Sequence, residues 1–305
     1  MTDTSPFEKK IIIVTGASSG FGRLAVEELG KAGHAVYAGI RDIAGRNAPT
    51  AADLAKRAAN AGPDLHPVEM DVTDDASVDA AIASVIAEQG RIDVIVHNAG
   101  HMVLGPAEAF TPDQYASVFD VNVLGAQRVN RAALPHLRAR RSGLVVWVGS
   151  SSTRGGCPPF LAPYFGAKAA MDAIAVSYAG ELIRFGVDTS IIVPGAFTRG
   201  TNHFAHAGKP FDVARATLYD EEYGALMESV NQRLGALLPE DADAGDIARA
   251  IAAVVDTPAG ERPFRVHIDP SKDGCEVVAA VADRIRVEFY HRIGLESLLV
   301  THSGL

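Results

Sequence analysis

The sequence contains little cysteine. Of its 305 residues only Cys157 and Cys275 are cysteines, they lie far apart, and neither belongs to a CxxC pair. Neither a disulfide framework nor a cysteine-based metal site is therefore indicated. His203 and His206 are three residues apart, but no third ligand follows at a matching spacing. We therefore predict no metal site.

Positive charge and long apolar runs are also scarce. The chain carries 28 lysines and arginines against 37 acidic residues, which gives a formal net charge of -9. Such a chain is a poor candidate for binding nucleic acid. No apolar run reaches the ~20 residues that span a bilayer, and residues 1–10 lack the apolar segment of a signal peptide. We expect a soluble, cytoplasmic protein with no nucleic-acid or membrane partner.

The sequence does contain a regular alternation of short apolar runs and longer amphipathic segments. The runs are brief and β-branched, as expected of strands buried on both faces; they lie at Lys10–Thr15, Ala35–Ile40, Leu65–Asp71, Val94–Asn98, Leu144–Gly149 and Thr189–Pro194, with a further one at Phe264–Ile268. Helical segments are predicted between them, at Gly22–Ala32, Ser77–Gln89, Pro112–Arg140 and Pro163–Phe185. This alternation predicts an α/β fold with a doubly wound parallel sheet.

Two segments interrupt the alternation. Residues 199–239 contain no clear strand, and residues 270–305 end in a helical stretch from Cys275 to about Arg292. No linker separates two cores, so we predict one domain over residues 1–305, with 199–239 as a substrate-side lid and 270–305 as a C-terminal extension. Residues 155–162 and 199–223 are expected beyond the carboxyl ends of the strands, where ligands bind in this fold. Their side chains either line the substrate pocket or only pack the lid onto the domain: Cys157, Pro158, Pro159, Phe160, His203, Phe204, His206, Phe211, Tyr219 and Tyr223.

A glycine-rich turn, Thr15–Gly22, follows the first predicted strand. Gly16 allows the tight turn, Gly20 lets the backbone approach a pyrophosphate, and Gly22 lets the next helix pack closely on the sheet. The N–H groups at the start of that helix, around Ser18, Ser19 and Phe21, favour a phosphate. The turn therefore predicts a dinucleotide site.

The spacing TGxxxGxG in this turn resembles the classical branch of the short-chain dehydrogenase/reductase family, and this resemblance implies a Rossmann fold that binds NAD(P). Arg41 follows the second strand, where the family places a basic residue in NADP enzymes; Asp42 is the alternative ribose contact and would favour NAD. The resemblance also implies adenine contacts by Asp71 and Val72, and a cleft-lining element formed by Asn98, Ala99 and Gly100. His97 precedes that element where the family more often has asparagine, and we assign it no chemistry.

Tyr164 and Lys168 are spaced so that they share one helix face. A free tyrosine has a pKa of ~10, and a nearby lysine lowers it toward neutrality. The pair matches the YxxxK motif of the family, in which the tyrosine is the general acid/base and the lysine holds the nicotinamide ribose. Asn122 matches the family asparagine that kinks the long helix and supports a water relay to the lysine.

A serine that binds the substrate oxygen is expected at the end of the fifth strand. The family spacing to the tyrosine selects Ser151, whereas counting forward from Asn122 selects Ser150, and Ser152 is a third choice. The choice between Ser150 and Ser151 stays open at this point.

The segment Pro194-Gly195-Ala196-Phe197-Thr198 resembles the family element beside the nicotinamide carboxamide. The family often has threonine at the place of Arg199, so Thr198 or Thr201 would take that role here. Pro194, Gly195, Phe197 and Thr198 therefore complete the set of predicted cofactor contacts.

Together these motifs predict an NADP-dependent carbonyl reductase or alcohol dehydrogenase, with NAD as the alternative cofactor and a small carbonyl or alcohol compound as substrate. The alternatives are a non-catalytic dinucleotide-binding sensor on the same fold and a sugar-nucleotide epimerase of the extended branch. The complete set of proton-transfer groups counts against the sensor, and the glycine spacing counts against the epimerase. The resemblance further implies a homodimer or homotetramer formed through the helices starting near Pro112 and Pro163.

Overall fold

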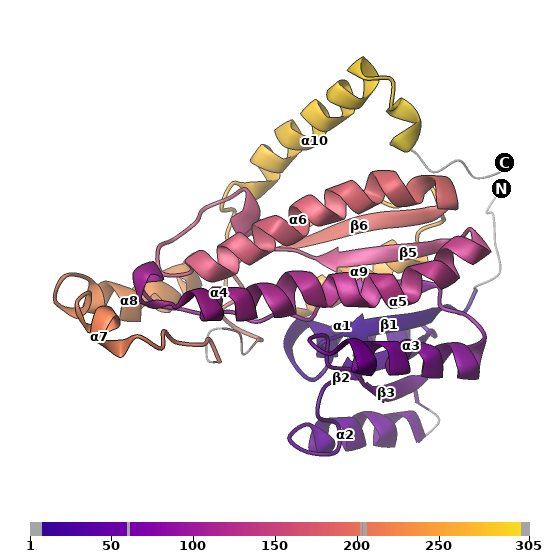
Figure 1. Ribbon diagram of the computed structural model, residues 1–305, viewed down its shortest axis with the longest axis horizontal. Coiled ribbons are helices and arrows are strands. Elements are labelled where there is room, and N and C mark those ends of the chain that lie inside the picture. The colour runs from indigo at the N-terminus through magenta and orange to yellow at the C-terminus, as the bar shows by residue number, and fades with distance from the viewer. Residues whose placement is uncertain (1–7, 60–61, 202, 204–205, 300–305) are drawn as a thin grey trace.

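The computed structural model describes residues 8–59, 62–201, 203 and 206–299. It contains a seven-stranded sheet in the order β3-β2-β1-β4-β5-β6-β7, in which every neighbouring pair is parallel (Figure 1). The strands are β1 Ile11–Thr15, β2 Ala35–Ile40, β3 Leu65–Glu69, β4 Val94–His97, β5 Gly143–Val148, β6 Val187–Pro194 and β7 Arg265–Ile268. The predicted α/β doubly wound parallel sheet is confirmed, and each predicted strand lies within two residues of an observed one.

Helices cover both faces of this sheet, as Figure 1 shows. One hydrophobic core lies between the sheet and α3 Asp75–Gln89, α5 Gly125–Arg140 and α6 Ala162–Leu182. The other lies between the sheet and α1 Gly20–Lys31, α2 Ala48–Ala59 and α9 Gly245–Asp256. The remaining helices are α4 Pro112–Phe119, α7 Val213–Thr217, α8 Asp220–Gly235 and α10 Cys275–Arg292.

Alternation along the strands explains why both cores form. In β1, Ile11 and Ile13 belong to one core while Ile12 and Val14 belong to the other. All four side chains are almost completely buried. Successive side chains of a strand point to opposite faces, so a strand with a helix layer on each side needs an unbroken apolar run. The runs seen in the sequence are the direct result of this arrangement.

The predicted helix Pro112–Arg140 is interrupted. A π-helical turn, Asp120–Leu124, separates α4 from α5, and Asn122 lies inside it. Turns of this type insert one residue and often occur at functional positions. The kink expected at Asn122 therefore takes the form of a π-turn.

The predicted lid and C-terminal extension lie at different places around the sheet. Within residues 199–239, α7 and α8 lie together at one end of the molecule, at the left in Figure 1. Helix α10 follows the edge strand β7 and projects away from the sheet. Only Cys275 and Ala279 of α10 are buried. No described helix is long and apolar enough to cross a membrane.

Candidate active site

The glycine turn lies between β1 and α1, where its backbone faces the end of β4. Gly16 has a φ of 66°, and a Cβ atom there would lie 2.7 Å from the Ala99 Cα, so only glycine fits. Ser19 is the N-cap residue of α1, but its side chain does not cap the helix. The first N–H groups of α1 are thus not taken by that side chain, as a phosphate site requires.

Asn98, which follows β4, binds this turn through its side-chain amide. Its side-chain Nδ2 donates to the carbonyl oxygens of Thr15, at 2.9 Å, and Gly16, at 3.1 Å. The Thr15 hydroxyl accepts the N–H groups of Asn98 and Ala99, both at 3.0 Å. The predicted Asn98-Ala99-Gly100 element and the glycine turn therefore form one hydrogen-bonded unit.

Replacing Gly22 by alanine tests how closely this unit is packed. A Cβ atom at Gly22 would lie 2.3 Å from Asn98 Nδ2 and 2.5 Å from the Gly16 carbonyl oxygen. We expect Gly22→Ala to lower the free energy of unfolding by about 1–3 kcal/mol and to weaken dinucleotide binding, measured by chemical denaturation and by titration. Gly224→Ala is the matched control, because its Cβ would meet only Asp220 at 3.8 Å. Equal stability of the two variants would contradict the close packing.

The end of β2 carries the predicted ribose contact. Arg41 is exposed, and Asp42 adopts a left-handed conformation with a φ of 51°. The Asp42 carboxylate accepts the Arg46 N–H at 2.8 Å, while Glu69 accepts the Asp42 N–H at 2.7 Å. The Asp42 carboxylate is thus engaged inside its own turn, directly beside Arg41 at the end of β2.

Asp71 and Val72 follow β3. The Asp71 carboxylate accepts the N–H of Thr73 at 3.0 Å and its hydroxyl at 2.8 Å. Burial would raise the pKa of Asp71, but these bonds and the charge of Arg41 bring it below its usual value. Val72 packs against the start of α5, because a Cβ atom at Gly125 would lie 2.8 Å from it. Arg41 thus acts on the loop expected to hold the adenine.

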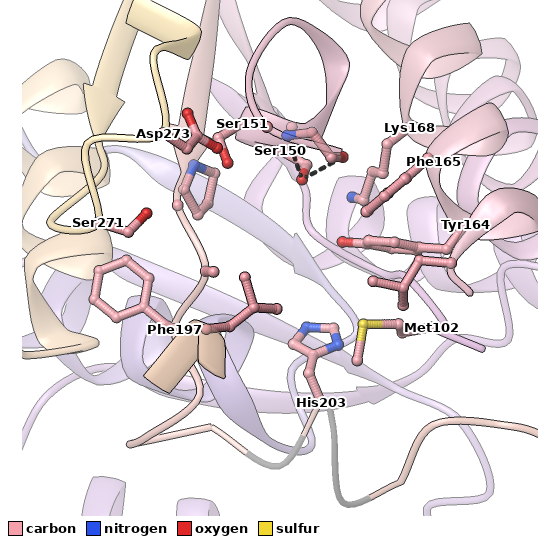
Figure 2. A pocket seen from close by; sticks show the side chains of 18 of the residues that line it. Met102, Ser150, Ser151, Tyr164, Phe165, Lys168, Phe197, His203, Ser271 and Asp273 are labelled. Atoms are coloured by element: carbon pink, nitrogen blue, oxygen red, sulfur yellow. Dashed lines mark hydrogen bonds between the residues drawn. The ribbon is translucent and has the colours of Figure 1, made fainter. Parts of the chain in front are cut away.

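Two neighbouring serines at the end of β5 face different partners (Figure 2). The Ser150 side chain faces Tyr164 and partly offsets the rise of the tyrosine pKa, and its hydroxyl oxygen lies 2.8 Å from the Ser152 hydroxyl. The Ser151 side chain instead lies near Asp273, where it lowers the pKa of this carboxyl against the larger opposing effect of burial. Ser150 is the N-cap of the short 3-10 helix Ser151–Thr153, and this turn sends the two side chains in different directions.

Tyr164 and Lys168 lie on α6 and face the same cavity (Figure 2). The Lys168 ammonium donates to the Val148 carbonyl oxygen at 2.9 Å and lies 6.0 Å from the centre of the Tyr164 ring. Burial raises the pKa of Tyr164 to about 12, partly offset by the Ser150 side chain, and burial lowers the pKa of Lys168 to about 8. The lysine does not lower the tyrosine pKa as expected, because loss of hydration dominates for both buried groups.

Asn122 is buried and fully engaged with backbone. Its Nδ2 donates to the carbonyl oxygens of His101 and Val118, both at 2.9 Å, and its Oδ1 accepts the His101 N–H at 3.3 Å. A Cβ atom at Gly100 would lie 2.9 Å from this Oδ1 and 3.7 Å from Lys168 Nζ. Asn122 therefore joins the π-turn to the loop after β4, directly beside the lysine.

The segment that follows β6 forms one wall of the cavity. Phe197 is buried and meets Phe21 of the glycine turn edge to face, with ring centres 5.7 Å apart. Thr198 faces α8, where a Cβ atom at Gly235 would lie 3.0 Å from its hydroxyl. The Thr201 hydroxyl donates to the Phe197 carbonyl oxygen at 3.1 Å. Pro194, Gly195 and Phe197 line the cavity, whereas Thr198 is not among its described lining residues.

These groups surround a cavity of about 440 Å³ at the carboxyl ends of β4, β5 and β6. Besides the predicted site residues, it is lined by Met102, Val148, Gly149, Ser152, Gly156, Cys157, Pro158, Leu161, Phe165, Ala196, His203, Leu234, Leu237, Ser271 and Asp273. The sequence pattern did not indicate Met102, Leu234, Leu237, Ser271 or Asp273. Their local sequences resemble no motif, and only the fold brings them together.

Of the two alternatives for the side chains of residues 155–162 and 199–223, lining of the cavity holds for Cys157, Pro158 and His203. Of the aromatic and histidine residues named in residues 155–223, only His203 lines the cavity in the described part of the chain, and Phe204 lies outside it. Phe211 is 78% exposed, and Phe160 packs against Tyr223 with ring centres 6.1 Å apart. Burial, together with the charge of Lys168, lowers the pKa of His203 to about 4, so its ring is neutral. Among the described residues, no group of three potential ligands could hold a metal ion.

A buried ion-pair network stabilises the turn formed by residues 150–154 after β5, called the serine turn below. Asp172, one turn after Lys168 on α6, is only 4% exposed. It accepts from Arg154 of the serine turn at 2.9 Å and from Arg265 of β7 at 2.5 Å. Arg265 also donates to Asp283 of α10 at 3.0 Å. The Asp172 carboxylate therefore connects α6, the turn after β5 and β7, and Arg265 extends this connection to α10.

A parallel sheet with a glycine-rich turn after its first strand, and a Tyr–Lys pair facing the same cavity, defines a nicotinamide-dependent oxidoreductase of the Rossmann class. A family model described as short chain dehydrogenase matches residues 10–209. The chain belongs to the short-chain dehydrogenase family, whose enzymes use NAD(P).

Comparisons with individual proteins agree with this assignment. Human 17-beta-hydroxysteroid dehydrogenase type 1 is 38% identical over 190 residues, which cover 61% of this chain and 56% of that protein. Across the first curated relatives, the matched region spans 54–66% of their length. A solved short-chain dehydrogenase from Streptomyces avermitilis is 28% identical and superimposes with a TM-score of 0.73, covering 96% of this chain and 98% of that one. A gluconate 5-dehydrogenase from Burkholderia cenocepacia J2315, solved with NADP and tartrate, is 25% identical with a TM-score of 0.66, covering 87% and 95%.

Proposed function

We propose that this enzyme transfers hydride between NADP(H) and a small carbonyl or alcohol substrate. The observation that carries the proposal is the arrangement of Ser150, Tyr164 and Lys168 on one wall of the cavity. The relative solved with NADP and the hydroxysteroid dehydrogenase relative support the cofactor and the substrate class. When bound, the cofactor supplies or accepts the hydride.

Each group has a distinct role in this proposal. Tyr164 donates a proton to the substrate oxygen during reduction and takes it back during oxidation, and its raised pKa keeps the phenol protonated at neutral pH. Ser150 holds the substrate oxygen by hydrogen bonding. Lys168 holds the nicotinamide ribose, and Asn122 positions the backbone beside it. Ser151 faces Asp273, so we assign the catalytic role to Ser150.

The residues at the carboxyl ends of the strands fit a bound dinucleotide. The start of α1 offers its N–H groups to the pyrophosphate, which concerns Gly16, Ser18, Ser19, Gly20, Phe21 and Gly22. Arg41 would bind the 2′-phosphate, and Asp71 with Val72 would border the adenine. The nicotinamide half would be bordered by residues that follow β4 and β6: Asn98, Ala99, Gly100, Pro194, Gly195, Phe197 and Thr198. Thr198 is the least supported of these contacts, because its side chain faces α8.

Arg41→Ala tests the cofactor preference. The substitution removes a charge-assisted bond to the 2′-phosphate, so we expect NADPH to bind about tenfold to a hundredfold more weakly. NADH affinity should hardly change, because NADH has no 2′-phosphate. Arg46→Ala is the matched control, since this second arginine lies in the same turn. A parent enzyme that prefers NADH would contradict the assignment of NADP.

The competing function is a dinucleotide-binding sensor without turnover. Oxidation of NADPH in the presence of a panel of ketones, aldehydes, quinones and sterols separates the two functions. Turnover of any member supports the oxidoreductase, whereas tight NADPH binding without turnover of any member favours the sensor.

We also propose that the enzyme acts as a soluble, cytoplasmic homodimer or homotetramer, with α4, α5 and α6 as the contact helices, and that residues 199–239 form a substrate lid. Leu234 and Leu237, which line the cavity from α8 and its C-terminal end, support the lid. Light scattering coupled to size-exclusion chromatography measures the oligomeric state.

A further inference from the structure

One end of the cavity is polar and is built from two separate loops. Ser151 comes from the turn after β5, whereas Ser271 and Asp273 come from the loop between β7 and α10. In Figure 2 these three side chains lie together, on the opposite side of the cavity from Tyr164 and Lys168. None of the three is part of the proposed hydride-transfer group.

The carboxylate and the Ser271 hydroxyl oxygen at this end offer acceptors to a ligand. The Ser271 hydroxyl donates its proton to the Asp269 carboxylate. Burial and the neighbouring Asp269 carboxylate raise the pKa of Asp273, whereas the nearby Ser151 hydroxyl lowers it. The Ser271 oxygen and the Asp273 carboxylate, which both line the cavity, therefore offer acceptors to a ligand.

Asp273 also supports the backbone, but this uses only part of its capacity. Its Oδ1 accepts the Cys275 N–H at the start of α10 at 2.9 Å. Each carboxylate oxygen has two lone pairs, so the group can accept further bonds. The serine turn is shaped around this carboxylate, because a Cβ atom at Gly155 would lie 2.3 Å from Oδ1.

The rest of the described lining brings the Cys157 thiol near Asp273, and this thiol donates to the Ser152 carbonyl oxygen at 3.0 Å. The other walls are mainly apolar, with Met102, Val148, Leu161, Phe197, Leu234 and Leu237. The one lysine of the lining, Lys168, is bonded to the Val148 carbonyl oxygen, and the His203 ring is neutral. The polar end thus carries negative charge and repels a ligand carboxylate.

We propose that Ser151, Ser271 and Asp273 form a specificity site for a substrate hydroxyl remote from the reacting carbonyl. This inference rests on the proposed function, since it names the class of its substrates: carbonyl compounds with a hydroxyl at the far end, and the corresponding diols. The hydroxyl donates to the Asp273 carboxylate. A protonated amine satisfies the same acceptors, whereas a carboxylate does not.

The test compares methyl alkyl ketones with their ω-hydroxy analogues over a series of chain lengths, with NADPH as reductant. The quantity measured is the ratio of kcat/KM for each hydroxylated ketone to that for its parent ketone. In Asp273→Asn, we expect this ratio to fall by about tenfold to a hundredfold at the best chain length. Asparagine keeps an acceptor for the Cys275 N–H, and the ratio is internal to each variant, so partial loss of folded enzyme cancels.

Glu276→Gln is the matched control. It removes the same charge from an exposed position three residues further on, outside the cavity lining, and should leave the ratio unchanged. The ω-amino ketones should behave as the ω-hydroxy ketones do, and ω-carboxylate ketones should be poor substrates of the parent enzyme and better ones of Asp273→Asn.

The outcomes separate this inference from the function on which it rests. If the ketones are reduced but Asp273→Asn affects hydroxylated and parent ketones equally, the specificity site is wrong while the oxidoreductase remains. A parent enzyme that prefers the ω-carboxylate ketones overturns the specificity site as well. If no ketone of any kind is reduced, the proposed substrate class fails first, and the specificity site fails with it.

Discussion

Tyr164→Phe is expected to lower kcat by about 10²–10⁴-fold, the usual contribution of a general acid. The substitution removes only the hydroxyl, so the ring remains packed and the glycine turn is untouched. NADPH affinity should therefore stay within a factor of about two, which corresponds to a change in binding free energy of less than about 0.5 kcal/mol. Steady-state kinetics and a fluorescence titration with NADPH measure the two quantities on one preparation.

Tyr178→Phe is the control for this substitution. Tyr178 lies on the same helix, but its hydroxyl donates to Gln127 at 2.6 Å and does not line the cavity. We expect its turnover to equal that of the parent enzyme. Undiminished turnover in Tyr164→Phe would refute the assignment of the proton donor.

The second large effect is expected at Ser150. Its side chain faces Tyr164 in the cavity, so Ser150→Ala removes a donor from the place where the substrate oxygen gains charge. We expect kcat/KM to fall by about 10²–10³-fold. Ser151→Ala is the matched comparison, because this neighbouring hydroxyl faces Asp273 instead.

The two serine variants should differ in kind as well as in size. With an unsubstituted ketone, Ser151→Ala should retain most of the parent turnover. If Ser151→Ala is the inactive variant and Ser150→Ala is not, the roles of the two serines are reversed.

The fold could be predicted from the sequence because the strands are buried on both faces. The apolar runs are continuous in β1 and β2, and their bounds follow the runs closely. Helices α2, α7, α8 and α9 lie outside the predicted helical segments. Helix α8 has a single buried residue, Val230, so its sequence has little of the periodicity that marks a packed helix.

The site could be predicted only where it depends on local spacing. The residues of the glycine turn lie in one loop, and Tyr164 and Lys168 lie on one helix. Their spacing in the sequence is therefore enough to predict them. The direction of the Ser150 and Ser151 side chains depends on a 3-10 turn, which spacing does not reveal. Asp273 follows Ser151 by more than a hundred residues and meets it only because β7 joins the sheet beside β6.

The network around Asp172 has a consequence for the architecture of the chain. A buried carboxylate that loses one of its guanidinium partners keeps a charge that is less fully compensated. A chain cut after β6 would lack Arg265 as well as α10, so Asp172 would keep only Arg154 as a partner and the sheet would lose an edge strand. The C-terminal third of the chain thus supplies part of the charge that stabilises α6, the helix that carries Tyr164 and Lys168.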